Sequence, residues 1–187
     1  MENKDKFEIY KNLLCDWSTR MNLVAPSTLT DIENRHFADS AQLLEYLPDD
    51  ADIIDLGSGA GFPGVVLAIL GRRVTCIESI AKKVSFLTAV KTQLNLDNLT
   101  IYHGRVEDYI ATMGRGKKTV FTARAFAPLL RILDYVRGRK NELFLLKGAH
   151  VREEINAAKQ KYNFDFELYR SKTGDGFIIN VKNYRPI

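Results

Sequence analysis

The segment Asp55-Leu56-Gly57-Ser58-Gly59-Ala60-Gly61 most constrains how this chain folds. An apolar run, Ile53-Ile54, precedes it, and a helix-compatible run from Phe62 to Leu70 follows it. A strand, a glycine-rich turn and a helix in that order form the first unit of a nucleotide-binding α/β sheet. The dinucleotide fingerprint G-x-G-x-x-G would need a glycine where Phe62 stands. Alternating glycines after an acidic residue indicate instead S-adenosylmethionine (SAM), a cofactor without a pyrophosphate to bind at a helix N-terminus.

Length and composition favour one globular domain. The chain has 187 residues, of which 45% are hydrophobic, and we expect residues 1–187 to form a single unit. No run approaches the ~18 to 20 apolar residues that cross a bilayer, and the N-terminus lacks the apolar core of a signal peptide. Cys15 and Cys76 have no metal-ligand spacing, so we expect two reduced thiols, no metal site and a cytoplasmic location.

The first fifty residues are predicted to be helical. Apolar residues recur at helical spacing and predict an amphipathic helix over residues 4–19; they are Phe7, Tyr10, Leu14, Trp17 and Met21. Pro26-Ser27-Thr28 is typical of a helix start, and residues 37–47 are predicted to form another helix. An N-terminal helical segment, residues 1–50, therefore precedes the sheet.

From residue 51 on, strands and helices alternate, which predicts a Rossmann-like core with a mostly parallel sheet of seven strands. The predicted strands are 52–56, 73–78, 99–103, 119–123 and 143–146. Helices are predicted after the second strand, with Ile80, Val84, Leu87 and Leu94 on one stripe, and over 127–136 and 151–162. The tails 164–169 and 177–181 alternate in polarity and predict an antiparallel edge pair.

Acidic residues at strand ends complete a candidate cofactor site. Asp55 ends the first strand, at the sheet edge where ligands bind in this fold, and can help to neutralise the cationic end of a ligand. Gly57 and Gly59 allow close backbone approach. Glu78 ends the second strand, about twenty residues later, where an acidic residue can bind ribose hydroxyls. The loop Gly104-Arg105-Val106-Glu107-Asp108 follows the third strand and can hold an adenine, although by itself it is also an ordinary helix start.

Positive charge is concentrated in one segment. The net charge is +4, but residues 113–152 contain far more basic than acidic residues. The basic ones are Arg115, Lys117, Lys118, Arg124, Arg131, Arg137, Arg139, Lys140, Lys147 and Arg152, against Asp134 and Glu142. Such clustering suits a polyanionic partner such as RNA, and a merely solvated basic face is the alternative.

Several motifs together resemble one family. Asp55 to Gly64, ending in Phe62-Pro63-Gly64, is similar to the signature of the glucose-inhibited division protein B family, also called ribosomal small-subunit methyltransferase G. The resemblance extends from about residue 10 to the end of the chain. It includes Trp17 with Met21-Asn22-Leu23, His36-Phe37-Ala38-Asp39-Ser40, the segment 78–87, Arg124-Ala125-Phe126-Ala127 and Lys147-Gly148.

The resemblance implies that the chain transfers a methyl group from SAM to N7 of a guanine, numbered 527, in 16S ribosomal RNA. It implies SAM contacts at Gly57, Phe62, Val106, Glu107 and Arg124, with Glu78 on the ribose. Because guanine N7 carries a lone pair and no proton, such a reaction needs no general base. The roles of His36, Asp39 and Asn22 stay open.

Arg124 and Lys147 end the fourth and fifth predicted strands, on the same sheet edge as the cofactor. We expect Arg124 to lie between SAM and substrate, and Lys147 to hold the base or a phosphate, with a surface ion pair as the alternative for each. We expect a monomer that acts on 16S rRNA or the small ribosomal subunit. The residues alone leave open a SAM enzyme for other RNA, protein or small molecules and a non-catalytic RNA-binding module, whereas Phe62 disfavours a dinucleotide dehydrogenase.

Overall fold

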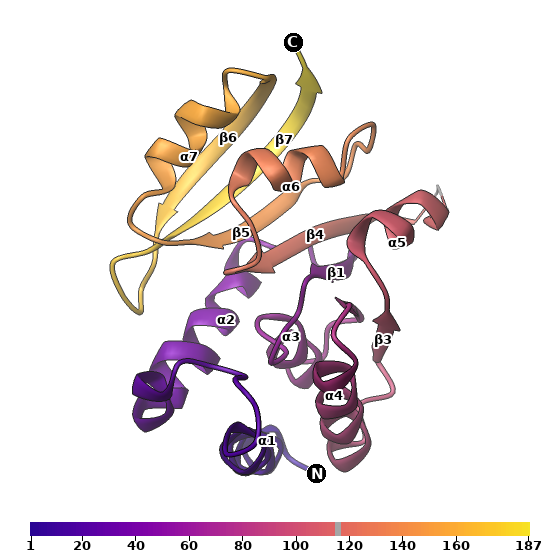
Figure 1. Ribbon diagram of the computed structural model, residues 1–187, viewed down its shortest axis with the longest axis vertical. Coiled ribbons are helices and arrows are strands. Elements are labelled where there is room, and N and C mark those ends of the chain that lie inside the picture. The colour runs from indigo at the N-terminus through magenta and orange to yellow at the C-terminus, as the bar shows by residue number, and fades with distance from the viewer. Residues whose placement is uncertain (115–116) are drawn as a thin grey trace.

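The structure, a computed structural model, describes residues 1–114 and 117–187, and Arg115 of the basic segment lies outside them. Over these residues the chain forms one mixed sheet covered by helices on both faces (Figure 1). The strands are β1 Asp52–Leu56, β2 Val74–Glu78, β3 Leu99–His103, β4 Thr119–Arg124, β5 Leu143–Lys147, β6 Tyr162–Arg170 and β7 Phe177–Pro186. The α-helices are α1 Asn3–Ser18, α2 Asp39–Ala41, α3 Gly64–Ile69, α4 Ala81–Leu94, α5 Val106–Thr112, α6 Leu129–Tyr135 and α7 Val151–Ala158.

The strand order explains where a ligand site forms. The sheet has seven strands in the order β3-β2-β1-β4-β5-β7-β6. Strands β1 to β5 pair in parallel, whereas β7 is antiparallel to both β5 and β6. The chain runs outward from β1 to β3 on one side and then returns to β4 on the other, so the switch point lies between β1 and β4. Ligands of such sheets bind outside the carboxyl ends of the strands at this point.

Successive residues of the central strands point to opposite faces of the sheet and pack into two hydrophobic cores, one on each face. Ile53 packs into the core that α1, α3 and α4 cover, whereas its neighbour Ile54 belongs to the core under α5, α6 and α7. Figure 1 shows α1, α3 and α4 in the lower half of the view, and α5, α6 and α7 in the upper half. The central strands are therefore buried on both faces, which is why β5 is apolar as far as Lys147 and why Ile53, Ile54 and Leu56 of β1 are all buried.

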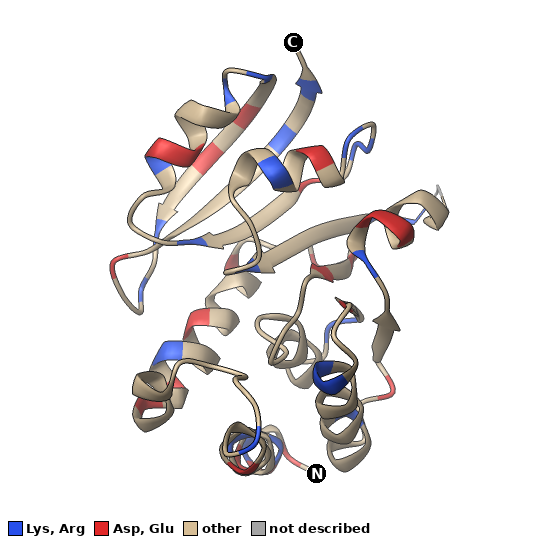
Figure 2. Ribbon diagram, viewed as in Figure 1, with Lys and Arg blue, Asp and Glu red and all other residues tan. Residues whose placement is uncertain are grey.

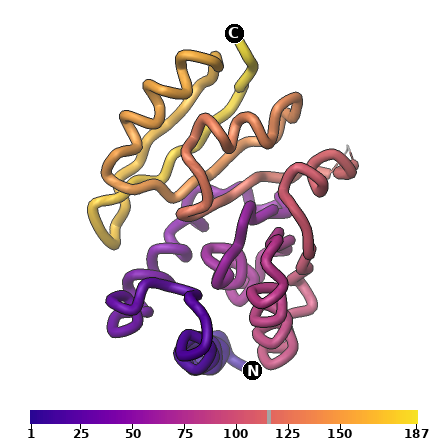
Figure 3. The backbone as a smooth tube through the Cα atoms, viewed as in Figure 1, coloured from indigo at the N-terminus to yellow at the C-terminus, as the bar shows by residue number. Residues whose placement is uncertain are grey.

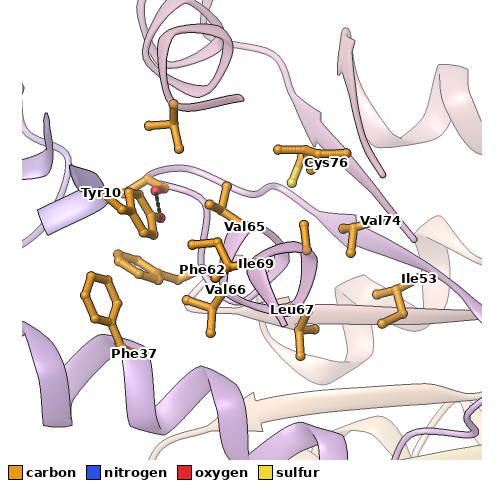
Figure 4. Close-up of a cluster of buried hydrophobic side chains, with 14 of the residues drawn as sticks. Tyr10, Phe37, Ile53, Phe62, Val65, Val66, Leu67, Ile69, Val74 and Cys76 are labelled. Atoms are coloured by element: carbon orange, nitrogen blue, oxygen red, sulfur yellow. Dashed lines mark hydrogen bonds between the residues drawn. The ribbon is translucent and has the colours of Figure 1, made fainter. Parts of the chain in front are cut away.

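The N-terminal helix is attached to the glycine-rich turn. Tyr10 of α1 is fully buried, and its hydroxyl donates a hydrogen bond of 2.6 Å to the carbonyl oxygen of Ala60. Figure 4 shows this contact beside Phe62 and Phe37. The Tyr10 ring also lies 5.3 Å from that of Phe37 and 5.5 Å from that of Phe62, measured between centroids. The N-terminal segment is thus part of the same core as the turn.

A second long-range contact ties residues 39–45 to the loop that joins β6 and β7. Gln42 donates to the Ser171 hydroxyl over 3.0 Å and accepts from the backbone N–H of Lys172 over 2.9 Å. Figure 3 shows this loop, in yellow-brown, reaching down toward the purple N-terminal segment. The antiparallel edge of the sheet therefore contacts the beginning of the chain.

The predicted class, a mostly parallel Rossmann-like sheet with an antiparallel C-terminal edge and a helical beginning, is confirmed. The predicted helix over 37–47 is wrong in form: a π-helical turn Glu33–Ala38, the short α2 and a 3₁₀ turn Gln42–Glu45 follow one another. Its irregular start places His36 and Asp39 against Arg124. Pro26 does begin a turn, the 3₁₀ turn Pro26–Asp31.

Several further boundaries differ from the prediction, and β6 and β7 both extend beyond the predicted 164–169 and 177–181. The helix over 151–162 ends at Ala158, because Tyr162 opens β6 and donates to Asp134 from there. The helix over 127–136 begins only after Pro128. Ile80 precedes α4 and is 50% exposed, so it is not on the buried stripe. Within the described ranges, no helix combines the length and the apolar character needed to traverse a bilayer.

Candidate active site

The turn after β1 needs glycine at two positions for steric reasons. Gly57 has a φ of +68°, and a Cβ built on it would lie 2.1 Å from the Phe126 ring. Gly61 has a φ of +94°, and a Cβ there would lie 2.7 Å from the Tyr10 hydroxyl. A side chain is therefore disfavoured at both positions for two reasons: the positive φ strains a residue with a Cβ, and the Cβ would clash with a neighbouring side chain. The backbone at Gly57 is accordingly close to the Arg124–Phe126 turn, and the backbone at Gly61 is close to α1.

Asp55 lies beneath the turn and not in the cavity above it. Its side chain is fully buried, and Oδ2 accepts a hydrogen bond of 3.1 Å from the backbone N–H of Gly64. Oδ1 has no hydrogen-bond partner among the described residues. Burial raises the pKa of Asp55 to about 7. The Asp55 carboxylate thus binds the start of α3 and does not line the cavity, where a contact with a cationic ligand was expected.

Glu78 joins the glycine turn to the end of β2. It is 6% exposed. One carboxylate oxygen accepts from the backbone N–H of Gly59 over 2.9 Å, and the other accepts from the N–H of Ile80 over 2.8 Å. Each carboxylate oxygen has a second lone pair, so Glu78 keeps acceptor capacity for two hydroxyl groups. These two hydrogen bonds fix the carboxylate at the wall of the adjoining cavity.

We call this the cofactor cavity. It has a volume of about 380 Å³, and the turns after β1, β2, β3 and β4 surround it. Of the residues predicted to bind the cofactor, it is lined by Gly57, Gly59, Phe62, Glu78, Val106, Glu107 and Arg124, but not by Asp55. Asn22 does not line it either, whereas Leu23 and Val24 do. Sequence reasoning also missed Ile80, Phe126 and Tyr135.

The lining of the cofactor cavity fits SAM. The Glu78 carboxylate suits ribose hydroxyls, and apolar side chains such as Ile80 and Val106 suit the faces of an adenine. No heavy atom comes closer than 4.0 Å to a Cβ built on Gly59, so the backbone there faces open space. Ile80 lies two residues after the end of β2, and sequence reasoning missed it because its spacing also fits the apolar stripe of the following helix.

Arg124, the last residue of β4, is held by the N-terminal segment. Its guanidinium donates to the carbonyl oxygen of Arg35 over 2.9 Å and to Asp39 Oδ2 over 3.1 Å, and it lies 2.6 Å from His36 Nδ1. The same guanidinium lies over the Phe62 ring, 4.7 Å from its centroid. Four contacts fix one side chain, so Arg124 has a single orientation at the border of the cofactor cavity.

His36 is neutral in this arrangement. Because a guanidinium only donates hydrogen bonds, His36 Nδ1 must accept, and Nε2 then carries the proton toward the Thr28 hydroxyl, 2.8 Å away. Burial and the neighbouring charge of Arg124 lower the pKa of His36 to about 4. The ring also stacks on Phe62, with centroids 4.8 Å apart. His36 is thus a positioning residue for Arg124 and Phe62.

A larger second cavity, of about 790 Å³, lies on the other side of the Arg124–Phe126 turn. Its wall is formed by residues 35, 36 and 39, by 124–128, by 146–149 with Glu154, and by 171 and 173–177. Arg124, Ala125 and Phe126 line both cavities, so the two spaces share this strip as a wall. Lys147, the last residue of β5, lines the second cavity together with Glu154 of α7. We call this space the substrate-side cavity.

Much of the basic segment is engaged within the protein. Lys117 pairs with Asp52 and Lys118 with Asp50, and Arg139 donates to the backbone carbonyl oxygens of Ile110 and Met113. Four exposed cations of the segment have no ion-pair partner among the described residues; they are Arg131, Arg137, Lys140 and Arg152. Figure 2 shows blue residues on α6 and on the turn that follows it. Fewer cations are therefore without an ion pair or hydrogen bond among the described residues than the number of basic residues in the segment indicates.

Comparison with solved structures shows the same fold elsewhere. A crystal structure of a mutant of MtNAS in complex with S-adenosylmethionine matches with a TM-score of 0.62 at 14% identity, covering 96% of this chain and 75% of the other. The B. subtilis tRNA methyltransferase TrmK matches with a TM-score of 0.54 at 15% identity, covering 77% of this chain and 64% of the other. At such identities the similarity establishes the fold alone.

Comparison of sequences gives the family. A ribosomal RNA small subunit methyltransferase G from Hyphomonas neptunium is 39% identical over 186 residues, covering 96% of this chain and 87% of that relative. Its counterpart from Rickettsia prowazekii is 34% identical over 188 residues, covering 98% and 95%. A family model described as rRNA small subunit methyltransferase G matches residues 3–175. This chain therefore belongs to the rRNA small subunit methyltransferase G family.

Proposed function

We propose that this chain is a SAM-dependent methyltransferase that modifies N7 of a guanine in small-subunit rRNA, the base numbered 527. The observation that carries the proposal is the shared wall of the two cavities. A cofactor-sized space built on the glycine turn meets a larger space at Arg124, Ala125 and Phe126. A methyl donor and a nucleobase must meet at such a border, and the chain belongs to a family named for methylation of this RNA.

Reaction at N7 matches the groups found at that border. SAM, when bound, supplies an electrophilic methyl group on a sulfonium. Guanine N7 is an unprotonated acceptor, so the protein has no proton to remove. His36, the titratable base nearest to Arg124, has both ring nitrogens engaged, by Arg124 and by Thr28. The contribution of the protein is then mainly orientation, which supplies roughly 7–11 kcal/mol in well-aligned reactions.

We assign the cofactor contacts to the predicted residues that line the smaller cavity. Glu78 accepts from the ribose hydroxyls, Gly57 and Gly59 offer backbone groups, and Val106 with Glu107 borders the adenine. Arg124 and Phe62 close the side that faces the substrate. Asp55 acts indirectly, through its hydrogen bond to the N–H of Gly64.

Exposed cations of the basic segment are assigned to RNA phosphates, in a cytoplasmic enzyme that works as a monomer. The four cations named above, among them Arg131 and Lys140, are on the surface. Replacing one phosphate-contacting cation reduces the slope of log affinity against log salt by about one. Lys140→Gln should show this change in RNA binding titrated with salt. A slope equal to that of the wild type would remove Lys140 from the RNA interface.

The reaction itself is tested by incubating the protein with radiolabelled SAM and small-subunit RNA that lacks the modification. We expect label at N7 of one guanine, detected by chemical cleavage at 7-methylguanine. Label in the protein, or on a nitrogen that carries a proton in the unmodified base, would contradict the proposal. The same reaction on intact small subunits shows which form of the RNA is the better substrate.

A further inference from the structure

The wall of the substrate-side cavity contains an ion pair that the proposed transfer does not yet use. Lys147 Nζ lies 2.7 Å from Glu154 Oε2, with side-chain exposures of 8% and 28%. Nζ also donates to the carbonyl oxygen of Ala127 over 2.7 Å, and Oε2 also accepts from the backbone N–H of Leu129 over 2.7 Å. A nearly buried lysine with a partly exposed carboxylate is thus fixed by the turn that leads into α6.

Both members of the pair keep unused hydrogen-bonding capacity. An ammonium has three protons, and Lys147 uses two of them in the contacts just given. Glu154 Oε2 already accepts two hydrogen bonds, from Leu129 and Lys147, whereas Oε1 has no partner among the described residues and can accept twice. The pair therefore offers a ligand in this cavity one donor next to an acceptor group.

We propose that the Lys147–Glu154 pair recognises the Watson–Crick edge of the target guanine, an inference that rests on the function proposed above. That edge presents an acceptor, O6, followed by two donors, N1–H and the N2 amino group. Lys147 donates to O6, and Glu154 Oε1 accepts from both N1–H and N2–H. Adenine presents a donor at position 6 and an acceptor at N1, so it would place like groups against both members of the pair.

The same orientation serves the chemistry at N7. Holding the base by its Watson–Crick edge leaves N7 without a protein hydrogen bond, so its lone pair stays available on the side of the shared strip. Methylation makes the base cationic, and the carboxylate of Glu154 at N1–H and N2–H stabilises the charge that develops there. Glu154 also offsets the charge of Lys147, so the ammonium at O6 adds little repulsion toward the cationic base.

The direct test removes the charge of Glu154 and varies the base. Glu154→Gln is compared with Glu153→Gln, a neighbour on α7 whose exposed side chain pairs only with exposed His150 in the described structure. Substrates are small-subunit RNAs with guanosine or inosine at the target, since inosine differs by lacking the 2-amino group. We expect the wild type and Glu153→Gln to prefer guanosine by roughly 10- to 100-fold in kcat/KM. Glu154→Gln should lose most activity on guanosine and most of this preference.

A binding experiment separates this inference from the proposed function. Guanosine, inosine and adenosine 5′-monophosphates are titrated into each protein and followed by NMR, which needs no methyl transfer. We expect the guanosine nucleotide to bind best, and the preference to disappear in Glu154→Gln. If this pattern appears without any methylation of rRNA, the function proposed above fails and the guanine site stands. If rRNA is methylated and Glu154→Gln behaves like Glu153→Gln in both assays, the guanine site is overturned.

Folding of the variant is checked by SAM calorimetry, which should be unchanged because Glu154 does not line the cofactor cavity. Should Glu154→Gln fail to fold, Glu154→Asp keeps the charge opposite Lys147 but shortens the reach into the cavity. It should retain SAM binding and lose preference for guanosine. Unchanged preference in a folded Glu154→Asp, with unchanged kcat/KM, would overturn the assignment of Glu154.

Discussion

The two cavities that meet at Arg124–Phe126 are built in different ways. Backbone turns after β1, β2, β3 and β4 form most of the cofactor cavity, and each follows a strand of the parallel sheet. The substrate-side cavity combines side chains from the N-terminal segment, the ends of β4 and β5, α7 and the β6–β7 loop. The first is a property of the fold, while the second depends on contacts between distant parts of the chain. Substitutions in the strip Arg124–Phe126 should therefore affect turnover. Substitutions in the cofactor cavity should affect SAM binding alone, and those in the substrate-side cavity should affect RNA binding alone.

The largest expected effect is on the border itself. Arg124→Met removes the contacts to Arg35, His36 and Asp39, so the strip between the cavities loses its fixed orientation. We expect kcat for methyl transfer to fall by about 100-fold, since small misplacements of reacting groups have effects of this size. SAM calorimetry should show a much smaller change. Wild-type kcat at saturating RNA would contradict the role of Arg124.

The next effect tests the cofactor side alone. Gly57→Ala places a Cβ 2.1 Å from the Phe126 ring. Gly71→Ala is the matched control, because Gly71 also has a positive φ but no heavy atom within 4 Å of its built Cβ. We expect Gly57→Ala to weaken SAM binding by roughly 10- to 100-fold through the 1–3 kcal/mol that overpacking typically costs. Gly71→Ala should bind SAM normally, and equal affinities for both variants would contradict a steric requirement at Gly57.

A smaller effect tests how the N-terminal segment supports the turn. Tyr10→Phe leaves the buried carbonyl oxygen of Ala60 without the hydrogen bond that Tyr10 provides. The free energy of unfolding should fall by about 1–3 kcal/mol, the usual range for a buried group left unsatisfied. Chemical denaturation measures it, and Tyr46→Phe, which removes a hydroxyl from a partly buried ring near Tyr169, is the control. A Tyr10→Phe variant as stable as this control would exclude the support role.

The last effects concern pH, because Asp55 and His36 change the stability of the fold in opposite directions. Asp55, under the glycine turn, has its pKa raised to about 7 by burial, above the ~3.9 of an unfolded aspartate. The folded protein binds more protons between these values, so its stability falls as pH rises through this window. His36, on the substrate side, has its pKa lowered to about 4, below the ~6.5 of an unfolded histidine. Its contribution is instead lost as pH falls from about 6.5 toward 4.

Thermal melts between about pH 4 and about pH 8 compare the wild type with Asp55→Asn and His36→Gln. Asp55→Asn should remove part of the loss of stability toward high pH, and His36→Gln should remove part of the loss toward low pH. Parallel curves for all three proteins would show that neither group titrates as described.

The sequence predicted the cofactor side well because that side is local. The carboxyl ends of neighbouring parallel strands lie at the same edge of the sheet. A glycine turn after one strand therefore lies next to an acidic residue at the end of the adjacent strand. β1, for example, has the predicted bounds, and Glu78 lies within 2.9 Å of Gly59 N. Asp55 lies beneath the turn and does not line the cavity, since a strand-end carboxylate can point either way and only packing decides which.

The substrate side was predictable only in part. Arg124 and Lys147 were placed at strand ends, where they lie. The partner of Lys147 was not foreseen, because Glu154 is on a helix whose facing residue depends on how α7 packs against α6 and the turn before it. The irregular turns of residues 33–45 were also missed, since tertiary contacts with Arg124 and Ser171 override their helical pattern.

The most direct test of this account is a structure of the protein bound to S-adenosylhomocysteine and a fragment of its target RNA. We expect S-adenosylhomocysteine in the cofactor cavity, with Glu78 on its ribose. We expect the target guanine in the substrate-side cavity, with N7 turned toward the strip Arg124–Phe126. A guanine that approaches from any other side, or a nucleoside product bound outside the glycine turn, would contradict it.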